Sequence, residues 1–153
     1  KLNILSQSKS MFLSNDRTRN IDFDWDRMLS FEGETGPYVQ YTHARACSIL
    51  RKAEKSFTKV NYSLLNNEEE LAVIRLLYDF PAAIEKAAKD YKPHHIANHL
   101  ITLSQAFNEF YHKCPVISER DEQMKARLLL VDSVRQVLEN GLGLLGIKAP
   151  DEM

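Results

Sequence analysis

The sequence contains few of the residues that interrupt or cross-link regular structure. Its 153 residues include five glycines, five prolines and two cysteines. A chain this poor in Gly and Pro, with 44% apolar residues, has the composition of a folded domain rather than of a disordered one. The two thiols, Cys47 and Cys114, lie far apart and form neither a disulfide framework nor a CxxC metal motif. We therefore expect both to be buried in helices of a cytoplasmic protein, where thiols stay reduced.

An excess of charge of one sign is also missing. The 20 Lys and Arg residues nearly balance the 21 Asp and Glu residues, for a net charge of −1. This balance excludes a nucleic-acid binder whose affinity comes from a diffuse cationic surface, so any RNA contact must be local. No apolar run reaches the roughly 18 residues of a membrane span, and the first residues lack the apolar core of a signal peptide. We expect no membrane partner, and because the chain opens on Lys1 we expect a fragment of a longer polypeptide.

Signatures of catalysis and of phosphate binding are absent as well. There is no GxSxG nucleophile motif and no glycine-rich phosphate loop, so we expect no catalytic residue and no ATP site in this chain. The glutamates at 68–70 cannot converge on one point of a helix, which favours a role in its first turn, next to the positive end of the dipole. In the HHxxxH run, His95 and His99 lie one turn apart after His94, but no third ligand is near. We expect a polar surface there and no bound metal.

What the sequence does contain is a series of amphipathic helical patterns. A proline fits the first turn of a helix and cannot continue a preceding one, so Pro37, Pro81 and Pro93 each predict a helix start. Gly146 predicts the end of the last helix. Alternating strand patterns are lacking. The prediction is an all-α bundle of about five or six helices, with starts near Asp24, Pro37, Asn67, Pro81, Pro93 and Ser118.

Apolar residues recur every three or four positions and predict which helix faces turn to the core. The stripe after Pro93 consists of Ile96, Leu100, Leu103, Phe107 and Phe110. The last pattern carries Leu128, Val131, Val134, Val137, Leu138, Leu142 and Leu145. The pattern after Pro37 carries Val39, Ala46, Ile49, Leu50 and Ala53. Ile84 and Ala88 are expected to point inward, and Asn67 with Glu70 forms a capping-box pattern.

The residues most suited to binding are aromatic and basic. Tyr38 and Tyr41 lie three positions apart and Arg45 four further on, so the three share one helix face. Asn108 and Tyr111 lie near the end of the penultimate helix. Unpaired RNA bases are read by stacking on such rings, while Arg or Asn bonds base edges and phosphates. The same tyrosines could instead be half-buried core residues with hydroxyls at the surface, and the pattern alone leaves both interpretations open.

Three segments resemble the arginyl-tRNA synthetases, a family of class I aminoacyl-tRNA synthetases. They read FDWDRMLSFEGETGPYVQYTHAR, LSQAFNEFYHKCPV and ARLLLVDSVRQVLENGLGLLGIKAPDEM. The similarity covers residues 12–153, in the order of the family's C-terminal helical domain, which is often named for a DALR motif. The nearest string here, Asp132-Ser133-Val134-Arg135, keeps only the two end residues. We expect this departure to affect helix packing rather than an RNA surface.

The resemblance implies a division of the chain and a parent enzyme. Residues 1–30 would be the end of a catalytic domain or a junction, and residues 31–153 an α-helical anticodon-binding domain. The parent would be an arginine–tRNA ligase that uses ATP and arginine, with magnesium, in a catalytic domain outside this chain. Its partners would be arginine tRNA, through the anticodon stem-loop, and the catalytic domain of the same polypeptide, in a cytoplasmic monomer. The alternative is a helical protein-interaction domain with no RNA role.

Position by position, the resemblance places three rings and a methionine beside the anticodon loop: Tyr38, Tyr41, Tyr111 and Met153. Arg45 and His43 are added because they share the helix face of the tyrosines, and Asn108 because it lies near Tyr111. Pro115 stands where some relatives have a further ring. Residues 25–27 match the junction, where we expect a structural hinge.

Overall fold

The computed structural model describes residues 9–10, 13–16, 35–53, 60–117 and 121–153. In these ranges the chain forms four long α-helices and no strand. The helices are α3 (Gly36–Ala53), α4 (Glu68–Asp90), α5 (His94–Lys113) and α6 (Asp121–Leu144), and a short 3-10 helix, η1 (Tyr62–Leu64), precedes α4. The predicted all-α class is confirmed.

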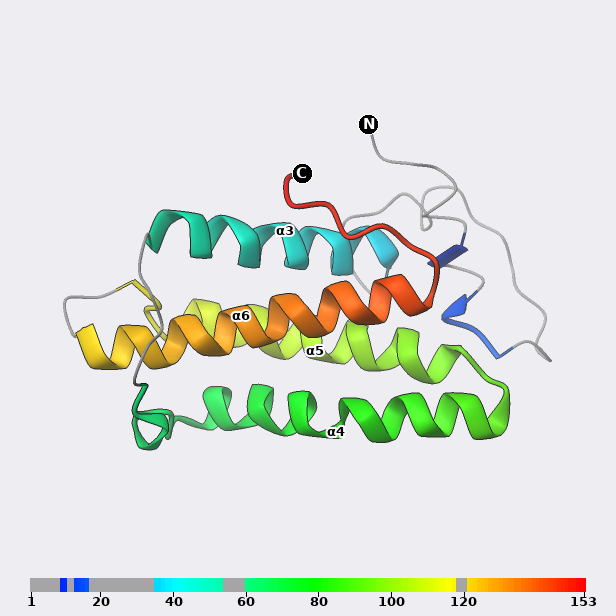
Figure 1. Cartoon of the computed structure of the whole chain (residues 1–153), viewed down its shortest axis with the longest axis horizontal. Helices are drawn as coiled ribbons and strands as arrows, with labels where there is room; N and C mark the ends of the chain where they lie inside the picture. The colour runs from blue at the N-terminus through cyan, green and yellow to red at the C-terminus, as the bar shows by residue number, and fades with distance from the viewer. Residues whose placement is uncertain (1–8, 11–12, 17–34, 54–59, 118–120) are drawn as a thin grey trace.

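The long helices lie side by side with their axes roughly aligned (Figure 1). α4 packs on α5, and α3 packs on both α5 and α6. The segment after α6, red in Figure 1, turns back along α3. Across the ranges described above, no helix combines the length and the apolar character that crossing a bilayer requires.

The described residues hold four of the predicted five or six helices, because Pro81 does not start a new helix and the helix predicted at Asp24 lies outside the described residues. α4 runs unbroken from Glu68 to Asp90 with Pro81 inside it. An interior proline costs about 3 kcal/mol through a lost hydrogen bond and a ring clash. Pro81 itself is exposed, whereas Phe80 beside it is buried at 7% exposure. Packing of the α4 face against α5 therefore holds the helix together through the proline.

Further predictions about the helices concern the inward face of α4 and two helix starts. Ile84 is partly buried against the core, as predicted. Ala88 was expected to point inward, but it is exposed and Ala87 is buried instead, because the buried face continues from Ile84 at a spacing of three residues rather than four. The short helix predicted to begin at Asp24, and Ser118 as a helix start, lie outside the described residues, as does the junction at 25–27.

The predicted apolar stripes form the core. All five stripe residues of α5 are buried, and Leu103, Phe107 and Phe110 have no exposed surface. The α6 stripe is buried except for Val137, which is partly so. In α3, Val39, Ala46 and Ile49 are buried, and Leu50 and Ala53 pack against the core partly exposed. Cys47 and Cys114 are both buried free thiols, as predicted.

The prediction that Gly146 marks the end of the last helix is confirmed, since α6 ends at Leu144. Gly146 has φ +66°, a left-handed conformation that suits glycine. The Ile147 amide donates to the Leu142 carbonyl at 2.9 Å, as in a Schellman cap. The cap reverses the chain direction and sends the tail, residues 147–153, back along α3.

A buried ion pair joins the start of α4 to α6. Glu70 Oε2 accepts hydrogen bonds from the backbone amides of Asn66 and Asn67, at 2.9 and 3.0 Å, which is the Glu70 half of the predicted capping box. Glu70 Oε1 accepts from Arg127 Nε at 2.7 Å, and Arg127 Nη1 donates to the Pro115 carbonyl at 2.8 Å. The side chains of Glu70 and Arg127 are 0% and 7% exposed. This glutamate therefore organises the bundle from inside rather than only facing the helix dipole.

Candidate nucleic-acid interface

The tail is attached to α3 by side chains that recur along one face of the helix. Gln40 Nε2 donates to the Lys148 carbonyl at 2.6 Å, and His43 Nδ1 bonds the Pro150 carbonyl at 2.9 Å. Because a carbonyl oxygen only accepts, Nδ1 carries the proton of the His43 ring. His43 is 1% exposed. The expectation that it faces RNA beside the tyrosines is therefore wrong, since this side chain binds the tail.

The same arrangement continues for two more turns of α3. Cys47 Sγ donates to Asp151 Oδ1 at 3.7 Å, and Arg51 Nη1 forms an ion pair with Glu152 Oε1 at 2.7 Å. Burial raises the pKa of the Cys47 thiol, and the negative charge of Asp151 raises it further. The tail thus runs parallel to α3 and brings Met153 alongside the middle of the helix.

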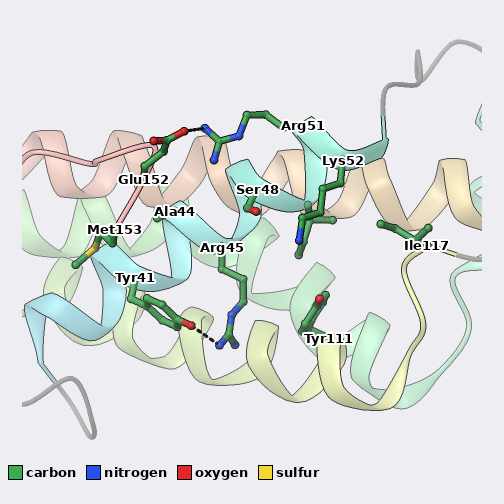
Figure 2. Close-up of a pocket in the computed structure, with 11 residues that line it drawn as sticks. Tyr41, Ala44, Arg45, Ser48, Arg51, Lys52, Tyr111, Ile117, Glu152 and Met153 are labelled. Atoms are coloured by element: carbon green, nitrogen blue, oxygen red, sulfur yellow. Dashed lines mark hydrogen bonds and ion pairs between the residues drawn. The ribbon is translucent and has the colours of Figure 1, made fainter.

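A pocket of about 500 Å³ opens between α3, the end of α5 and the tail. Figure 2 shows Tyr41 and Arg45 joined on one side, Arg51 and Glu152 joined on another, and Tyr111 across from them. The lining residues are Tyr41, Ala44, Arg45, Ser48, Ile49, Arg51, Lys52, Tyr111, Ile117, Glu152 and Met153.

Arg45 links the two tyrosines of the pocket. Its guanidinium carbon lies 4.8 Å from the ring centre of Tyr41 and 5.8 Å from that of Tyr111, within range of cation–π attraction. Nη2 donates to the Tyr41 hydroxyl at 3.1 Å and Nη1 to Asn108 Oδ1 at 2.7 Å. Both tyrosines are 40% exposed. Their rings are therefore reachable from solvent, and the half-buried core interpretation does not describe them.

The other two predicted site residues, Tyr38 and Asn108, do not line the pocket. Asn108 Nδ2 donates to the Tyr38 hydroxyl at 2.8 Å, and Tyr38 is half-buried and does not line the pocket. The Tyr111 ring stacks on the fully buried Phe107, with centroids 6.5 Å apart and planes 18° apart. Tyr38 and Asn108 thus support Arg45, while Phe107 fixes the Tyr111 ring.

The pocket is locally cationic although the chain is not. Arg45, Arg51 and Lys52 line it together with a single acidic side chain, Glu152. The Arg51–Glu152 pair is exposed, at 51% and 78%, and such pairs contribute only about 0–1 kcal/mol. A phosphate can therefore compete for Arg51 at low cost.

Four of the six predicted site residues line the pocket: Tyr41, Arg45, Tyr111 and Met153. Five further lining residues with polar, charged or large apolar side chains were not predicted from the sequence: Ser48, Arg51, Lys52, Ile117 and Glu152. Ser48 and Lys52 continue the spacing of Tyr41 and Arg45 on the same α3 face, so helical periodicity could have found them. No local signal marks Ile117 or Glu152, which the fold brings there from other segments.

Two histidines of the HHxxxH run bond separate groups. His95 Nε2 pairs with Asp90 Oδ2 at 3.1 Å, and His99 Nε2 bonds the Leu76 carbonyl at 2.9 Å. Each of these nitrogens is directed to a partner on α4.

Comparison with known families assigns the helical fold to a class of domain. A family model described as the DALR anticodon binding domain matches residues 39–153. The chain belongs to this family. Asp132 and Arg135, the retained ends of the motif, form an ion pair at 2.9 Å within α6, and Val134 between them is fully buried.

Its relatives are arginine–tRNA ligases. The chain is 49% identical over 142 residues to arginine–tRNA ligase of Alkaliphilus metalliredigens and 50% identical over 142 residues to that of Clostridioides difficile. Each match covers 92% of this chain and 25% of the relative. The chain therefore spans about a quarter of the length of these curated relatives.

The solved structures that resemble this chain include arginyl-tRNA synthetases. Arginyl-tRNA synthetase of Thermus thermophilus matches with a TM-score of 0.91 and 38% identity, over 97% of this chain and 26% of that one. The enzyme of Plasmodium falciparum matches with a TM-score of 0.87 and 28% identity, over 97% of this chain and 27% of that one.

Proposed function

We propose that this chain recognises the anticodon stem-loop of arginine tRNA for an arginine–tRNA ligase. The observation that carries the proposal is the open pocket in which Arg45 stands between the exposed rings of Tyr41 and Tyr111. Unpaired bases of an RNA loop bind by stacking on such rings, with arginine donating to base edges or phosphates. The family and the arginine–tRNA ligase relatives support the identity of the RNA.

The six site residues predicted from the sequence have two kinds of role in this proposal: some contact the RNA and others hold Arg45 in place. Tyr41 and Tyr111 offer stacking surfaces, and Met153 packs beside the bases. Arg45 donates to the RNA, while Tyr38 and Asn108 hold it in position through the hydrogen bonds that join α3 to α5. Arg51 and Lys52 at the rim bind backbone phosphates.

The chemistry belongs to a catalytic domain of the parent protein. In this proposal residues 1–30 are the end of that domain or a junction segment, and residues 31–153 are the binding domain. ATP, arginine and magnesium act in the catalytic domain, in a cytoplasmic monomer. Binding at the anticodon orients the distant acceptor end, so binding energy gained far from the reaction is used to position the substrate.

Titration of the chain with a labelled anticodon stem-loop tests the binding. A stacked base contributes about 1–3 kcal/mol, so Tyr41→Ala or Tyr111→Ala should weaken binding roughly 5- to 150-fold. Tyr111→Phe should bind nearly as well as the original because the ring is kept. Tyr78→Ala is the matched control, since Tyr78 on α4 is 83% exposed and lies outside the pocket.

The contribution of the charged pocket residues to RNA binding is measured separately, from the salt dependence of the affinity. Each phosphate contact to single-stranded nucleic acid contributes about −0.7 to the slope of log K against log salt concentration. Lys52→Ala should therefore reduce the steepness of that slope by about 0.7. In the parent enzyme, Tyr38→Ala and Tyr111→Ala should lower tRNA charging while circular dichroism stays unchanged. Unaltered charging in both variants, or no stem-loop binding at micromolar concentrations, would instead favour a protein-interaction domain.

A further inference from the structure

Three metal-ligating side chains meet where the tail crosses α3. His43 and Cys47 are one turn apart on α3 and are 1% and 8% exposed, and Asp151 of the tail is exposed. One ligand atom from each lies within 4.8 Å of the other two. The Cys47 sulfur lies 3.8 Å from His43 Nε2 and 3.7 Å from Asp151 Oδ1.

These distances suit one small cation. Zinc bonds imidazole nitrogen, thiolate sulfur and carboxylate oxygen at about 2.0–2.3 Å, which places tetrahedral donors roughly 3.3–3.8 Å apart. The Cys47 sulfur lies 3.7 Å from Asp151 Oδ1 and 3.8 Å from both ring nitrogens of His43, so the three donors reach one cation once the Cys47 and Asp151 side chains rotate toward the Nε2 side of the ring. Because Asp151 is exposed, the fourth ligand position faces solvent.

The His43 ring is held in the tautomer that a metal requires. Nδ1–H donates to the Pro150 carbonyl at 2.9 Å, so the lone pair of Nε2 is directed away from that bond. Metal-binding histidines commonly donate their second nitrogen to a carbonyl or carboxylate in this way, which fixes the ring and raises the basicity of the ligand.

We propose that His43, Cys47 and Asp151 bind a thiophilic divalent cation of the zinc type. On binding, the Cys47 thiol releases one proton to solvent, a sulfur–metal bond forms, and the hydrogen bond from Cys47 to Asp151 is replaced by two bonds to the cation. No electron is transferred. The cation cross-links the tail to α3 and thereby fixes Glu152 and Met153 at the pocket.

Cobalt provides the direct test, because tetrahedral Co²⁺ reports its ligands optically and replaces zinc. The chain is stripped with a chelator under reducing conditions, dialysed and titrated with Co²⁺. The expected result is one cobalt per chain, visible d–d bands of tetrahedral geometry and a near-ultraviolet charge-transfer band from a single thiolate. Added Zn²⁺ should then abolish all of these bands.

Matched variants separate this site from other binding. Cys47→Ser should remove the charge-transfer band, and Asp151→Asn, at an exposed position, should weaken cobalt binding at least about tenfold. The controls are Cys114→Ser, the other buried thiol, and Glu152→Gln, the neighbouring carboxylate, which should both bind as the original chain does. No thiolate band, or an equal band in Cys47→Ser, would overturn the proposal. RNA binding enters none of these readouts.

Discussion

The side-chain carbonyl of Asn108 on α5 accepts a hydrogen bond of 2.7 Å from Nη1 of Arg45 on α3. The amide of the same residue donates to Tyr38 at 2.8 Å. Asn108 Nδ2 also donates to Thr42 Oγ1 at 3.4 Å. One side chain therefore bonds three groups of the neighbouring helix and fixes the direction of the arginine that lies between the pocket rings.

Replacing this asparagine should loosen Arg45 without removing any pocket residue. We expect Asn108→Ala to weaken stem-loop binding by about 1–2 kcal/mol, because hydrogen bonds to charged groups contribute about 1.5–3 kcal/mol and Arg45 keeps its bond to Tyr41. Fluorescence titration measures the change. Gln105→Ala, at an exposed position one turn earlier on α5, should bind normally. Equal losses in the two variants would contradict a role of Asn108 through Arg45.

Replacing each of two glycines of α6 with alanine should change the free energy of unfolding in opposite directions. A Cβ at Gly141 would lie 2.5 Å from Leu100 Cδ2, whereas one at Gly143 would meet nothing within 4 Å. Gly141→Ala should destabilise by about 1–3 kcal/mol through overpacking. Gly143→Ala should stabilise by about 0.5–1 kcal/mol, since alanine loses less backbone entropy in a helix. Urea unfolding of both variants checks the signs, and a stabilised Gly141→Ala would show that α5 and α6 pack less closely than described.

The Glu70–Arg127 pair should be sensitive to the loss of one partner. Glu70→Leu leaves the buried guanidinium without its carboxylate and should cost about 3–5 kcal/mol. The double variant Glu70→Leu with Arg127→Leu should recover part of that loss, because no charge is then left unpaired in the core. Asp132→Ala breaks a partly exposed pair with Arg135 and should cost at most about 1 kcal/mol. A double variant less stable than Glu70→Leu would refute this account.

Lys113 on α5 gives a prediction about pH. Its ammonium bonds Glu69 at 2.8 Å and Glu109 at 2.9 Å. The hydrogen bond from Lys113 lowers the pKa of Glu69 below its ordinary 4.5. A lowered pKa in the folded state contributes stability that is present above pH 4.5 and is lost as the pH falls through the folded value. NMR titration of the Glu69 carboxylate should show its pKa returning toward 4.5 in Lys113→Met, and Lys89→Met, at an exposed position on α4, should leave it unchanged.

The sequence was sufficient for features that depend on local spacing. The α5 stripe from Ile96 to Phe110 repeats every three or four residues, and that period alone specifies which face is buried. The helix start predicted at Pro81 was wrong because the rule that proline ends a helix considers only local structure. The burial of Phe80 against α5 offsets the cost of the proline, and that contact is not visible in the local sequence. Tyr41 and Arg45 were predicted as neighbours on one helix face. Tyr111 was a candidate from its place near the end of the penultimate helix, but only the family resemblance placed it at the same site as Tyr41.

The tail could not have been predicted by the same means. Gln40 and His43 bond backbone carbonyls 108 and 107 residues away, and a backbone carbonyl has no residue signature. The cluster of His43 and Cys47 escaped notice for the same reason, since its third member, Asp151, lies 104 residues from Cys47. The HHxxxH run has no third candidate ligand near it in the sequence, whereas the fold brings Cys47 and Asp151 beside a different histidine, His43.

The course of the tail also has a practical consequence for anyone preparing this protein. Met153 lines the pocket, so an affinity tag or reporter fused after it would emerge directly among the tyrosines and arginines. Such a fusion would obstruct the pocket while leaving the bundle intact. A purification handle that follows Met153 therefore needs a protease site for its removal.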